Sequence, residues 1–379
     1  MAGEGGAPLY ERIKAELRAA IGRGEYEPGS PFVTQRELCE RYGVSTTTAV
    51  KALNDLVAEG LLIRRQGRGT FVAEPAARQI RSTSGNSIAC IVHGLNAAHV
   101  SNVVSGVESV CAELGYRMYL SDTARQDVAA SPQREAQALR EALDSGVAGI
   151  VLYPVEGHHN TDLLTEVQRH EIPIVLVDRY RPELPTDAVI VDNFSIGYQL
   201  TQHLVAAGHE RILTLWSETD VTSVRDRLTG HVQALRDSGL TVRPEFTSLR
   251  PYQQLPQEQR LAMLKPVLEG DEPPTAVLCA NGYVVAAAAK DLVALGKDVP
   301  TDIALAGMDD AGPFDLLPLT TVSAHLPSHE LGVESMRLLS GRIDGTSASL
   351  PPRQITLSTS IHTHDSGSGY LRAVSSESA

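Results

Sequence analysis

The sequence predicts an α/β protein in which a small winged helix-turn-helix module precedes a two-lobed body of doubly wound parallel sheets. Two patterns carry this prediction. Near the N-terminus, two helical segments separated by about three or four residues are followed by a short arginine-rich hairpin. Beyond residue 88, apolar runs of strand length alternate with helical stretches, which is typical of parallel sheets covered by helices on both faces.

Length and charge agree with this division. At 379 residues the chain exceeds one ordinary core, which favours two or three domains. Residues 1–81 hold 12 Lys and Arg against 10 Asp and Glu, whereas the remainder holds 21 against 36. Because an acidic body discourages contact with polyanions, we expect any nucleic-acid contact to be confined to the N-terminal module.

Several classes of site lack support in the sequence. The cysteines are scattered without a C-x-x-C pair, and the histidine pairs at 158–159 and 362/364 lie in loop-like sequence without further ligands. No P-loop, nucleophile elbow or dinucleotide fingerprint is present. We therefore predict no metal, no cofactor and no enzymatic activity. The four cysteines are Cys39, Cys90, Cys111 and Cys279.

The sequence also predicts where in the cell the protein is located. The N-terminal stretch "MAGEGGAPLYERIK" has no apolar core, as a secretory signal would have, and no run approaches a membrane span. Together with unpaired cysteines this predicts a soluble protein of the cytoplasm.

The first helix follows from apolar periodicity. Between residues 9 and 21, apolar side chains recur every four residues, so they form one stripe of an amphipathic helix. A turn-rich break, "GEYEPGSPF", follows this helix. The stripe consists of Leu9, Ile13, Leu17 and Ile21.

Capping residues delimit the next two helices and the hairpin. Thr34 and Glu37 have the spacing of a capping box, and Gly43 is suited to end the helix that they begin. Ser45 is the expected N-cap of a third helix, which stops at Gly60. The segments "LLIRRQ" and "TFVA", joined by "GRG", then predict two strands of a wing.

The body is predicted from its strands. We expect four regions: the winged helix-turn-helix at 1–73, a linker at 74–87, the two-lobed effector-binding and dimerisation domain at 88–362, and a disordered tail at 363–379. The expected strands of the body are "SIACIV", "YRMYL", "AGIVLYP", "IPIVLVD", "AVIVDN", "RILTLW", "TAVLCA", "DIALAG" and "TTVSA".

Residues 8–73 resemble the DNA-binding domain of the GntR family of regulators. The resemblance rests on "QREL" at 35–38, "RYGVS" at 41–45, "LVAEGLL" at 56–62 and "RRQGRGTFV" at 64–72. It implies that the helix after Gly43 enters the major groove and that the wing supplies cations to phosphates or to the minor groove.

The positions assigned to DNA are polar or basic. Hydroxyls at a helix N-terminus can donate to phosphates or contact base edges. Alternatively, Ser45 only caps its helix and the arginines of the hairpin are merely solvated. Two positions that usually hold arginine in that family hold Thr46 and Val50 here, which bears on the operator sequence. The expected DNA-binding residues are Arg36, Ser45, Thr46, Thr47, Thr48, Lys51, Arg64, Arg65 and Arg68.

Residues 88–362 resemble the effector-binding domain of LacI/GalR-type regulators, which is related to periplasmic sugar-binding proteins. The matches include "VLVDRY" at 175–180, "HLVAAGHERI" at 203–212, "CAN" at 279–281, "GMDD" at 307–310 and "PLTTV" at 318–322. The combination resembles regulators of the arabinose-repressor type, with a GntR head on a LacI-type body.

The second resemblance implies a ligand site between two lobes, at the carboxyl ends of strands. Asp178 would accept from hydroxyls of a sugar and Arg227 would donate to its oxygens. Alternatively, Asp178 pairs with Arg179 as a structural bridge, Asp309 caps a turn, and the ring of Tyr252 packs in a core rather than stacking on a ligand. The expected effector-binding residues are Asp178, Arg227, Asn281, Asp309 and Tyr252.

Two positions depart from the LacI/GalR pattern. Gly282 stands where the family often has Asp, and Ala324 where it often has Gln. The loss of two polar contacts predicts an effector that is smaller or less hydroxylated than a hexose.

These observations together predict a transcriptional regulator, most simply a repressor, that binds a palindromic DNA operator as a homodimer and is switched by a small effector, with a sugar as the expected class. The helix at 328–340 could supply an interface or be an ordinary lobe helix. The alternatives are a sugar-binding protein for transport or sensing and a sugar-modifying protein with a DNA-binding head. An aminotransferase-like body would need a Schiff-base lysine, and Lys265, Lys290 and Lys297 show no such setting.

Overall fold

The chain divides into two compact units, Met1–Asn86 and Ser87–Ala379. Most of the segments predicted as linker and tail fall outside the described residues. Among the residues described, no helix is long and apolar enough to cross a membrane. The computed structural model describes residues 9–22, 26, 29–58, 61–65, 69–72, 86–124, 130–217, 220–308, 319–346 and 350–364.

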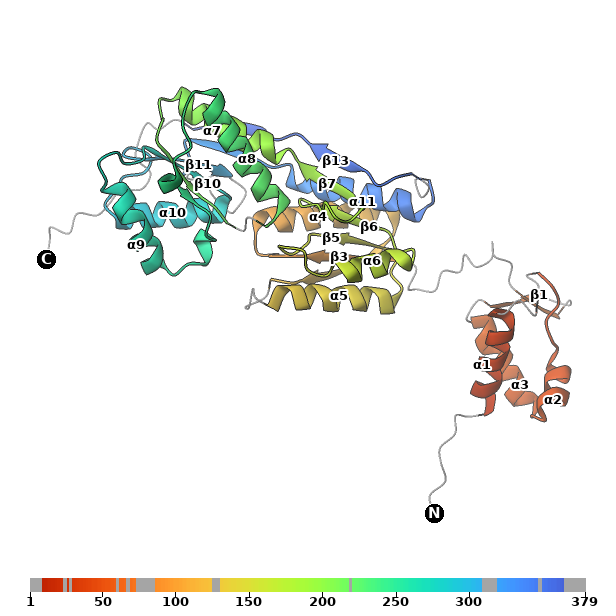
Figure 1. Ribbon diagram of the computed structural model, residues 1–379. Coiled ribbons are helices and arrows are strands. Elements are labelled where there is room, and N and C mark those ends of the chain that lie inside the picture. Colours follow the sequence, from red (N-terminus) through yellow and green to blue (C-terminus); the bar gives the residue numbers. More distant parts are fainter. Residues whose placement is uncertain are drawn as a thin grey trace, which may run out of the picture. The chain divides into compact units, whose positions relative to one another are not determined.

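The first unit has three helices and a hairpin (Figure 1). The predicted capping box is present: Thr34 Oγ1 accepts from Glu37 N at 3.3 Å, and Glu37 Oε2 accepts from Thr34 N at 2.6 Å. Gly43 ends the same helix with φ 62°, a conformation that glycine adopts without strain. The elements are α1 (Leu9–Gly22), α2 (Gln35–Tyr42), α3 (Thr46–Ala58), β1 (Leu62–Arg65) and β2 (Gly69–Val72).

The wing has one more strand-like segment than the sequence predicts. β1 and β2 pair antiparallel, as expected. Residues 29–32 lie along the other edge of β2, where Phe32 N donates to Thr70 O at 2.8 Å and Val72 N donates to Ser30 O at 2.9 Å. Phe32 is buried in the core of the unit, so this contact fixes the hairpin to the helices.

The second unit contains two lobes, each built on a six-stranded sheet. The sheet of lobe 1 has the order β13-β7-β6-β5-β3-β4, and its neighbouring strands are parallel throughout. Its strands are β3 (Ser87–Val92), β4 (Arg117–Asp122), β5 (Gly149–Leu152), β6 (Ile174–Val177), β7 (Asp187–Val191) and β13 (Gln354–Leu357).

Helices cover both faces of the lobe 1 sheet. Because successive side chains of a strand point to opposite faces, Ile88 and Cys90 join one core while Ala89 and Ile91 join another. The first core contains α4 and α11, and the second contains α5 and α6. These helices are α4 (Ala98–Leu114), α5 (Ser131–Ser145), α6 (Thr161–Arg169) and α11 (Ser328–Ile343).

Lobe 2 repeats this plan. Its sheet has the order β14-β12-β11-β10-β8-β9, with only β14 antiparallel to its neighbour. Helices lie on both sides of this sheet (Figure 1). Its strands are β8 (Ile212–Leu215), β9 (Thr247–Ser248), β10 (Ala276–Cys279), β11 (Ala304–Met308), β12 (Val322–His325) and β14 (Ser360–Thr363). Its helices are α7 (Asn193–Ala206), α8 (Thr222–Asp237), α9 (Gln257–Leu268), α10 (Gly282–Ala294) and the short η4 (Pro244–Phe246) and η5 (Tyr252–Gln254).

The chain passes between the lobes three times, after β7, after β12 and between β13 and β14. The predicted fold class, a winged helix-turn-helix followed by doubly wound parallel sheets, is confirmed. Every apolar run that was expected to be a strand forms one. The sequence missed β9, β13 and β14, which are partly exposed edge strands and so lack a continuous apolar run.

Candidate functional site

The N-terminal end of α3 exposes hydroxyls on a helix whose other face is buried. Thr46 and Thr47 are exposed in the first turn, and Lys51 is exposed one turn further along. The opposite face follows the i, i+3, i+4, i+7 spacing of a helix packed on a core. It consists of Ala49, Ala52, Leu53 and Leu56.

Ser45 caps this helix. Its Oγ accepts from Thr48 N at 3.3 Å and lies 2.9 Å from Thr48 Oγ1. The structure thus gives Ser45 the capping function that the sequence left as one alternative. Capping orients the first turn of α3, so that Thr46 and Thr47 stand at a helix N-terminus with its partial positive charge.

The basic residues expected at DNA have different surroundings. Arg36 lies on α2 with 88% of its side chain exposed, and its Nε is 2.9 Å from Glu40 Oε1. The Nζ of Lys51 lies 3.8 Å from the centroid of the Tyr10 ring. Arg64 and Arg65 belong to β1, but their side chains lie outside the described residues, as does the whole of Arg68.

The second candidate site is a cavity of about 490 Å³ between the lobes. Lobe 1 contributes the segment that joins β3 to α4 and the ends of β5 and β6, while lobe 2 contributes the start of α10 and part of η5. Cavities of this size hold small metabolites. The described lining residues are His93, Gly94, Asn96, Ala97, His99, Val100, Tyr153, Arg179, Gln253, Asn281, Gly282, Tyr283 and Ala287.

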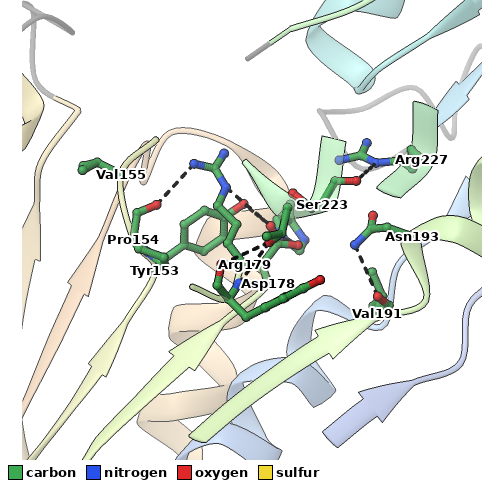
Figure 2. A network of polar contacts seen from close by, with 12 residues as sticks. Tyr153, Pro154, Val155, Asp178, Arg179, Val191, Asn193, Ser223 and Arg227 are labelled. Atoms are coloured by element: carbon green, nitrogen blue, oxygen red, sulfur yellow. Dashed lines mark hydrogen bonds and ion pairs between the residues drawn. The ribbon is translucent and has the colours of Figure 1, made fainter. Parts of the chain in front are cut away.

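Asp178 lies directly behind this lining (Figure 2). It follows β6, is 6% exposed, and accepts from the hydroxyl of Tyr153 at 2.8 Å. Its other oxygen lies 3.3 Å from His99 Nε2, and Arg179 Nε lies 3.8 Å from the carboxylate. His99 Nδ1 in turn lies 2.8 Å from the hydroxyl of Ser328 on α11. Asp178 therefore ties together three residues of the cavity wall.

The charge of Asp178 is stabilised in place. Burial opposes ionisation, but the contacts with His99, Arg179 and Tyr153 outweigh it and hold the pKa of Asp178 well below its usual range. The backbone of Asp178 has φ 66°, which is uncommon for a residue with a side chain. Such strained positions cluster at functional sites, where the surrounding structure holds them.

Of Arg227 and Asn281, Asn281 belongs to the described lining of the cavity and Arg227 does not. Arg227 is 7% exposed, and its Nε donates to Ser223 O at 3.0 Å (Figure 2). Its Nη1 contacts Ala280 O and the sulfur of Met308. Asn281 caps α10, because its Oδ1 accepts from Val284 N at 3.0 Å. Its side chain is also part of the cavity lining.

Of the other two expected effector residues, the structure describes Tyr252 but not Asp309. Tyr252 is 0% exposed, and its hydroxyl donates to Asp291 at 2.8 Å, so its ring packs in the core of lobe 2. This is the alternative that the sequence left open, and it removes Tyr252 from the cavity wall. Asp309 lies outside the described residues.

Asn281 is the one described lining residue that was predicted as an effector residue. The polar and aromatic lining residues that were not predicted are His93, Asn96, His99, Tyr153, Arg179, Gln253 and Tyr283. The signal that could have found them is position, because His93, Tyr153 and Arg179 directly follow β3, β5 and β6 or lie one residue beyond. Gln253 gave no such signal, since it lies in a 3₁₀ helix between strands.

A direct contact joins the lobes beside the cavity. The hydroxyl of Thr222, in the first turn of α8, accepts from Tyr180 N at 3.1 Å and donates to Tyr180 O at 3.3 Å. Tyr180 is two residues beyond Asp178, and Thr222 is five residues before Arg227. The contact therefore connects the two segments that carry the expected effector residues.

No grouping of three His, Cys, Asp or Glu side chains suited to a metal occurs among the residues that the structure describes. The four cysteines are free thiols, and three of them are buried. Burial raises the pKa of Cys90 to about 12 and of Cys111 to about 11, so neither is a reactive thiolate near neutral pH.

A winged helix-turn-helix joined to a two-lobed binding body defines the class of ligand-responsive transcriptional regulators. Residues 85–362 match the family model described as periplasmic binding proteins and sugar binding domain of LacI family. Residues 9–72 match the model of bacterial regulatory proteins of the gntR family. The chain belongs to the family of LacI-type periplasmic-binding-protein-like regulators and carries a GntR-type head.

Curated relatives support the same assignment over most of the chain. An arabinose metabolism transcriptional repressor of Geobacillus stearothermophilus is 27% identical over 88% of this chain and 90% of its own length. The HTH-type transcriptional repressor CytR of Escherichia coli strain K12 is 27% identical over 82% of this chain and 90% of its own length. These relatives are repressors and not enzymes.

Solved structures share the fold. A putative ribose operon repressor from Burkholderia thailandensis matches 74% of this chain and 100% of its own, with TM-score 0.63 and 27% identity. A complex of the regulator CelR with cellobiose matches 86% of this chain and 92% of its own, with TM-score 0.63 and 24% identity. Both predicted resemblances are thereby confirmed.

Proposed function

We propose that this chain is a dimeric repressor that binds a two-fold operator through its heads and a small effector in the cavity between its lobes. The observation that carries the proposal is the presence in one chain of exposed hydroxyls at the N-terminus of α3 and a cavity that both lobes line. Effector binding changes the angle between the lobes and thus the separation of the two heads.

The DNA-binding part rests on α3 and the wing. In this proposal Thr46 and Thr47 contact base edges, and the wing residues Arg65 and Arg68 contact phosphates. Arg65→Ala and Arg68→Ala should each weaken operator binding and reduce its salt dependence by about one unit of slope. Binding is measured by fluorescence anisotropy over a series of salt concentrations. The same affinity and slope in both variants would exclude the wing from the interface.

The effector part rests on Asp178 and Arg227. Both are buried: Asp178 contacts the lining residue Tyr153, and Arg227 contacts the main chain of Ala280, which precedes the lining residue Asn281. Asp178→Asn and Arg227→Ala should remove the response of operator binding to effector while operator binding itself persists. A normal response in both variants would show that the effector binds elsewhere.

A second copy of the chain is the proposed occupant of the exposed edge of lobe 1. β4 is an edge strand, and its residues Tyr119 and Leu120 are 57% and 41% exposed; Leu114, at the end of α4, is 46% exposed. Unpaired apolar edges are normally covered or charged, and a two-fold operator calls for two heads. α11, which the sequence left open as an interface, has its apolar residues buried within the lobe.

The dimer proposal is tested by sedimentation. Tyr119→Asp places a charge on the exposed edge and should convert the dimer to a monomer. Phe194→Asp is the matched control, because Phe194 is also an exposed aromatic, 41%, but lies on α7 in lobe 2. If the Tyr119→Asp protein is still a dimer, or if both variants dissociate to the same extent, β4 is not part of the interface.

The competing function is a sugar-modifying protein with a DNA-binding head. The two differ in what happens to the ligand, because a sensor releases it unchanged. Incubating the protein with a ligand that stabilises it and analysing the recovered ligand by mass spectrometry separates the two. Any converted product would contradict the proposed role as a sensor.

A further inference from the structure

The cavity between the lobes is lined by hydrogen-bond donors and cations. Arg179 brings a permanent positive charge, His93 and His99 bring imidazoles, and Asn96 brings an amide. Among the lining residues that the structure describes, none is a carboxylate. This is notable in a chain whose residues beyond 81 carry 36 Asp and Glu against 21 Lys and Arg.

Two carboxylates that contact lining residues already accept from protein donors. Asp178 is bonded to the Tyr153 hydroxyl at 2.8 Å and paired with His99 and Arg179. Asp122, at the end of β4, accepts at 3.0 Å from both Gly94 N and Ala124 N. Neither carboxylate is part of the described lining, so the wall that a ligand meets is rich in donors.

Two long helices begin at this wall. α4 has 17 residues and starts after Ala97, which supplies no side-chain cap to its first amides. α10 has 13 residues; its N-cap Asn281 accepts from Val284 N, and its first residue, Gly282, has no side chain. A helix N-terminus favours negative charge, and a cap of Ala in place of Ser or Asp leaves amides for another acceptor. The two starts add to the charge of Arg179 in the same cavity.

We propose that the effector carries an oxyanion, a phosphate monoester or a carboxylate, which binds against Arg179 and the starts of α4 and α10. The inference rests on the proposed function, since it names the chemistry of the effector of that site. Asn281, which also lines the cavity, can donate to a hydroxyl of the same molecule. A sugar phosphate or a sugar acid has both parts.

The sharpest variant is Gly282→Asp. It adds a carboxylate to the cavity at the first position of α10, where a negative charge is favourable for the helix. Gly282→Asn is the matched control, because it has the same shape without the charge. Arg179→Gln removes the cation from the other wall, and Arg169→Gln, an exposed arginine on α6, is its control.

The probe is inorganic phosphate, with potassium chloride at equal ionic strength as reference. The full-length protein should show a saturable rise in its unfolding midpoint with phosphate. The apparent Kd should increase at least tenfold in Gly282→Asp and in Arg179→Gln and stay within twofold in Gly282→Asn and Arg169→Gln. A rise that does not saturate, or that is the same in all five proteins, would overturn the inference, because phosphate also stabilises proteins by exclusion from their surface.

A second set of probes distinguishes the source of the oxyanion. Ribose 5-phosphate and glucose 6-phosphate represent phosphate monoesters, gluconate and glucuronate represent sugar acids, and ribose and glucose are the neutral references. Stabilisation by a neutral sugar that Gly282→Asp does not weaken would contradict the anionic effector and leave the proposed function intact. If the wild-type protein did not bind an operator in the anisotropy assay, this would instead contradict the proposed function and leave the phosphate result unchanged.

Discussion

The two lobes of the body pack one pair of helices in the same way. In lobe 1, α4 crosses α11 where Gly106 faces Gly332; in lobe 2, α7 crosses α8 where Gly197 faces Gly230. A Cβ on any of these glycines would overlap backbone atoms of the opposite helix. Each crossing also holds a buried histidine whose Nδ1 lies 2.8 Å from a hydroxyl of the partner helix.

The histidines show where the lobes differ. His99 of lobe 1 lies at the start of α4, lines the cavity and approaches Asp178 at 3.3 Å. His231 of lobe 2 lies in the middle of α8 with Thr201 as its partner, and burial lowers its pKa to about 4. The same packing thus holds a histidine beside the Asp178 carboxylate in one lobe and a histidine in a neutral core contact in the other.

The largest expected effect is a loss of stability at the glycine crossings. Gly332→Ala and Gly230→Ala should each lower the free energy of unfolding by about 3 kcal/mol, because the added methyl group overlaps backbone that cannot move without separating the helices. Chemical unfolding in urea measures the change. Equal losses would support equal packing of the two lobes.

Ser105→Ala is the control for these variants. Ser105 is exposed and adjoins Gly106 on α4, so its replacement should change stability by less than about 0.5 kcal/mol. If the Gly332→Ala protein were as stable to urea as the Ser105→Ala protein, α4 and α11 would not approach each other as closely as described.

The next effect is a pH-dependent loss of stability due to His231. Unfolded His231 has a pKa near 6.5, whereas in the folded protein burial lowers it to about 4. As the pH falls below 6.5 the unfolded chain therefore binds a proton that the folded chain does not, and stability decreases until about pH 4. Between pH 7 and pH 5 this proton uptake lowers the free energy of unfolding by about 2 kcal/mol.

Two variants isolate this contribution. His231→Asn keeps a polar atom near the Thr201 hydroxyl and cannot take up a proton, so it should lose about 2 kcal/mol less than the wild type between pH 7 and pH 5. His203→Asn, an exposed histidine on α7, should behave as the wild type does. Urea unfolding at the two pH values gives both numbers. An unchanged pH dependence in His231→Asn would mean that His231 is solvated.

The sequence predicts the elements of both lobes better than the wall of the cavity. Apolar runs reveal β3 and β10, because strands covered on both faces contain little else. The polar end of β6 reveals Asp178, yet its partner His99 is 79 positions earlier in the chain, and no local pattern connects the two. Tyr252 shows the opposite limit, since an aromatic residue between strands suits a core and a ligand equally well.

A smaller effect is expected on ligand binding from His99. His99→Asn removes a ring that lines the cavity and contacts Asp178, so the affinity for phosphate should fall about tenfold, as expected for loss of one charge-assisted contact. His231→Asn should leave this affinity unchanged. If both variants bind phosphate as the wild type does, the contrast between the two histidines has no functional meaning.

The smallest expected effect concerns the contact between the lobes. Thr222→Val removes the hydroxyl that binds both main-chain groups of Tyr180 and keeps the shape of the side chain. The contact holds the segment of Asp178 against the helix of Arg227, which prepares both residues for the effector. A loss of about 1 kcal/mol of this preorganisation weakens effector binding about fivefold.

Thr229→Val is the control for Thr222→Val, because Thr229 lies on the same helix and donates to Arg225 O within that helix, at 2.9 Å. It should leave effector affinity unchanged. Titration calorimetry with the effector that raises the unfolding midpoint gives the affinities. Tighter binding in Thr222→Val would assign the contact to the effector-free arrangement of the lobes, and equal binding would show that this contact does not take part in the switch. Equal binding would therefore locate the coupling between the lobes elsewhere, whereas tighter binding would place it at this contact.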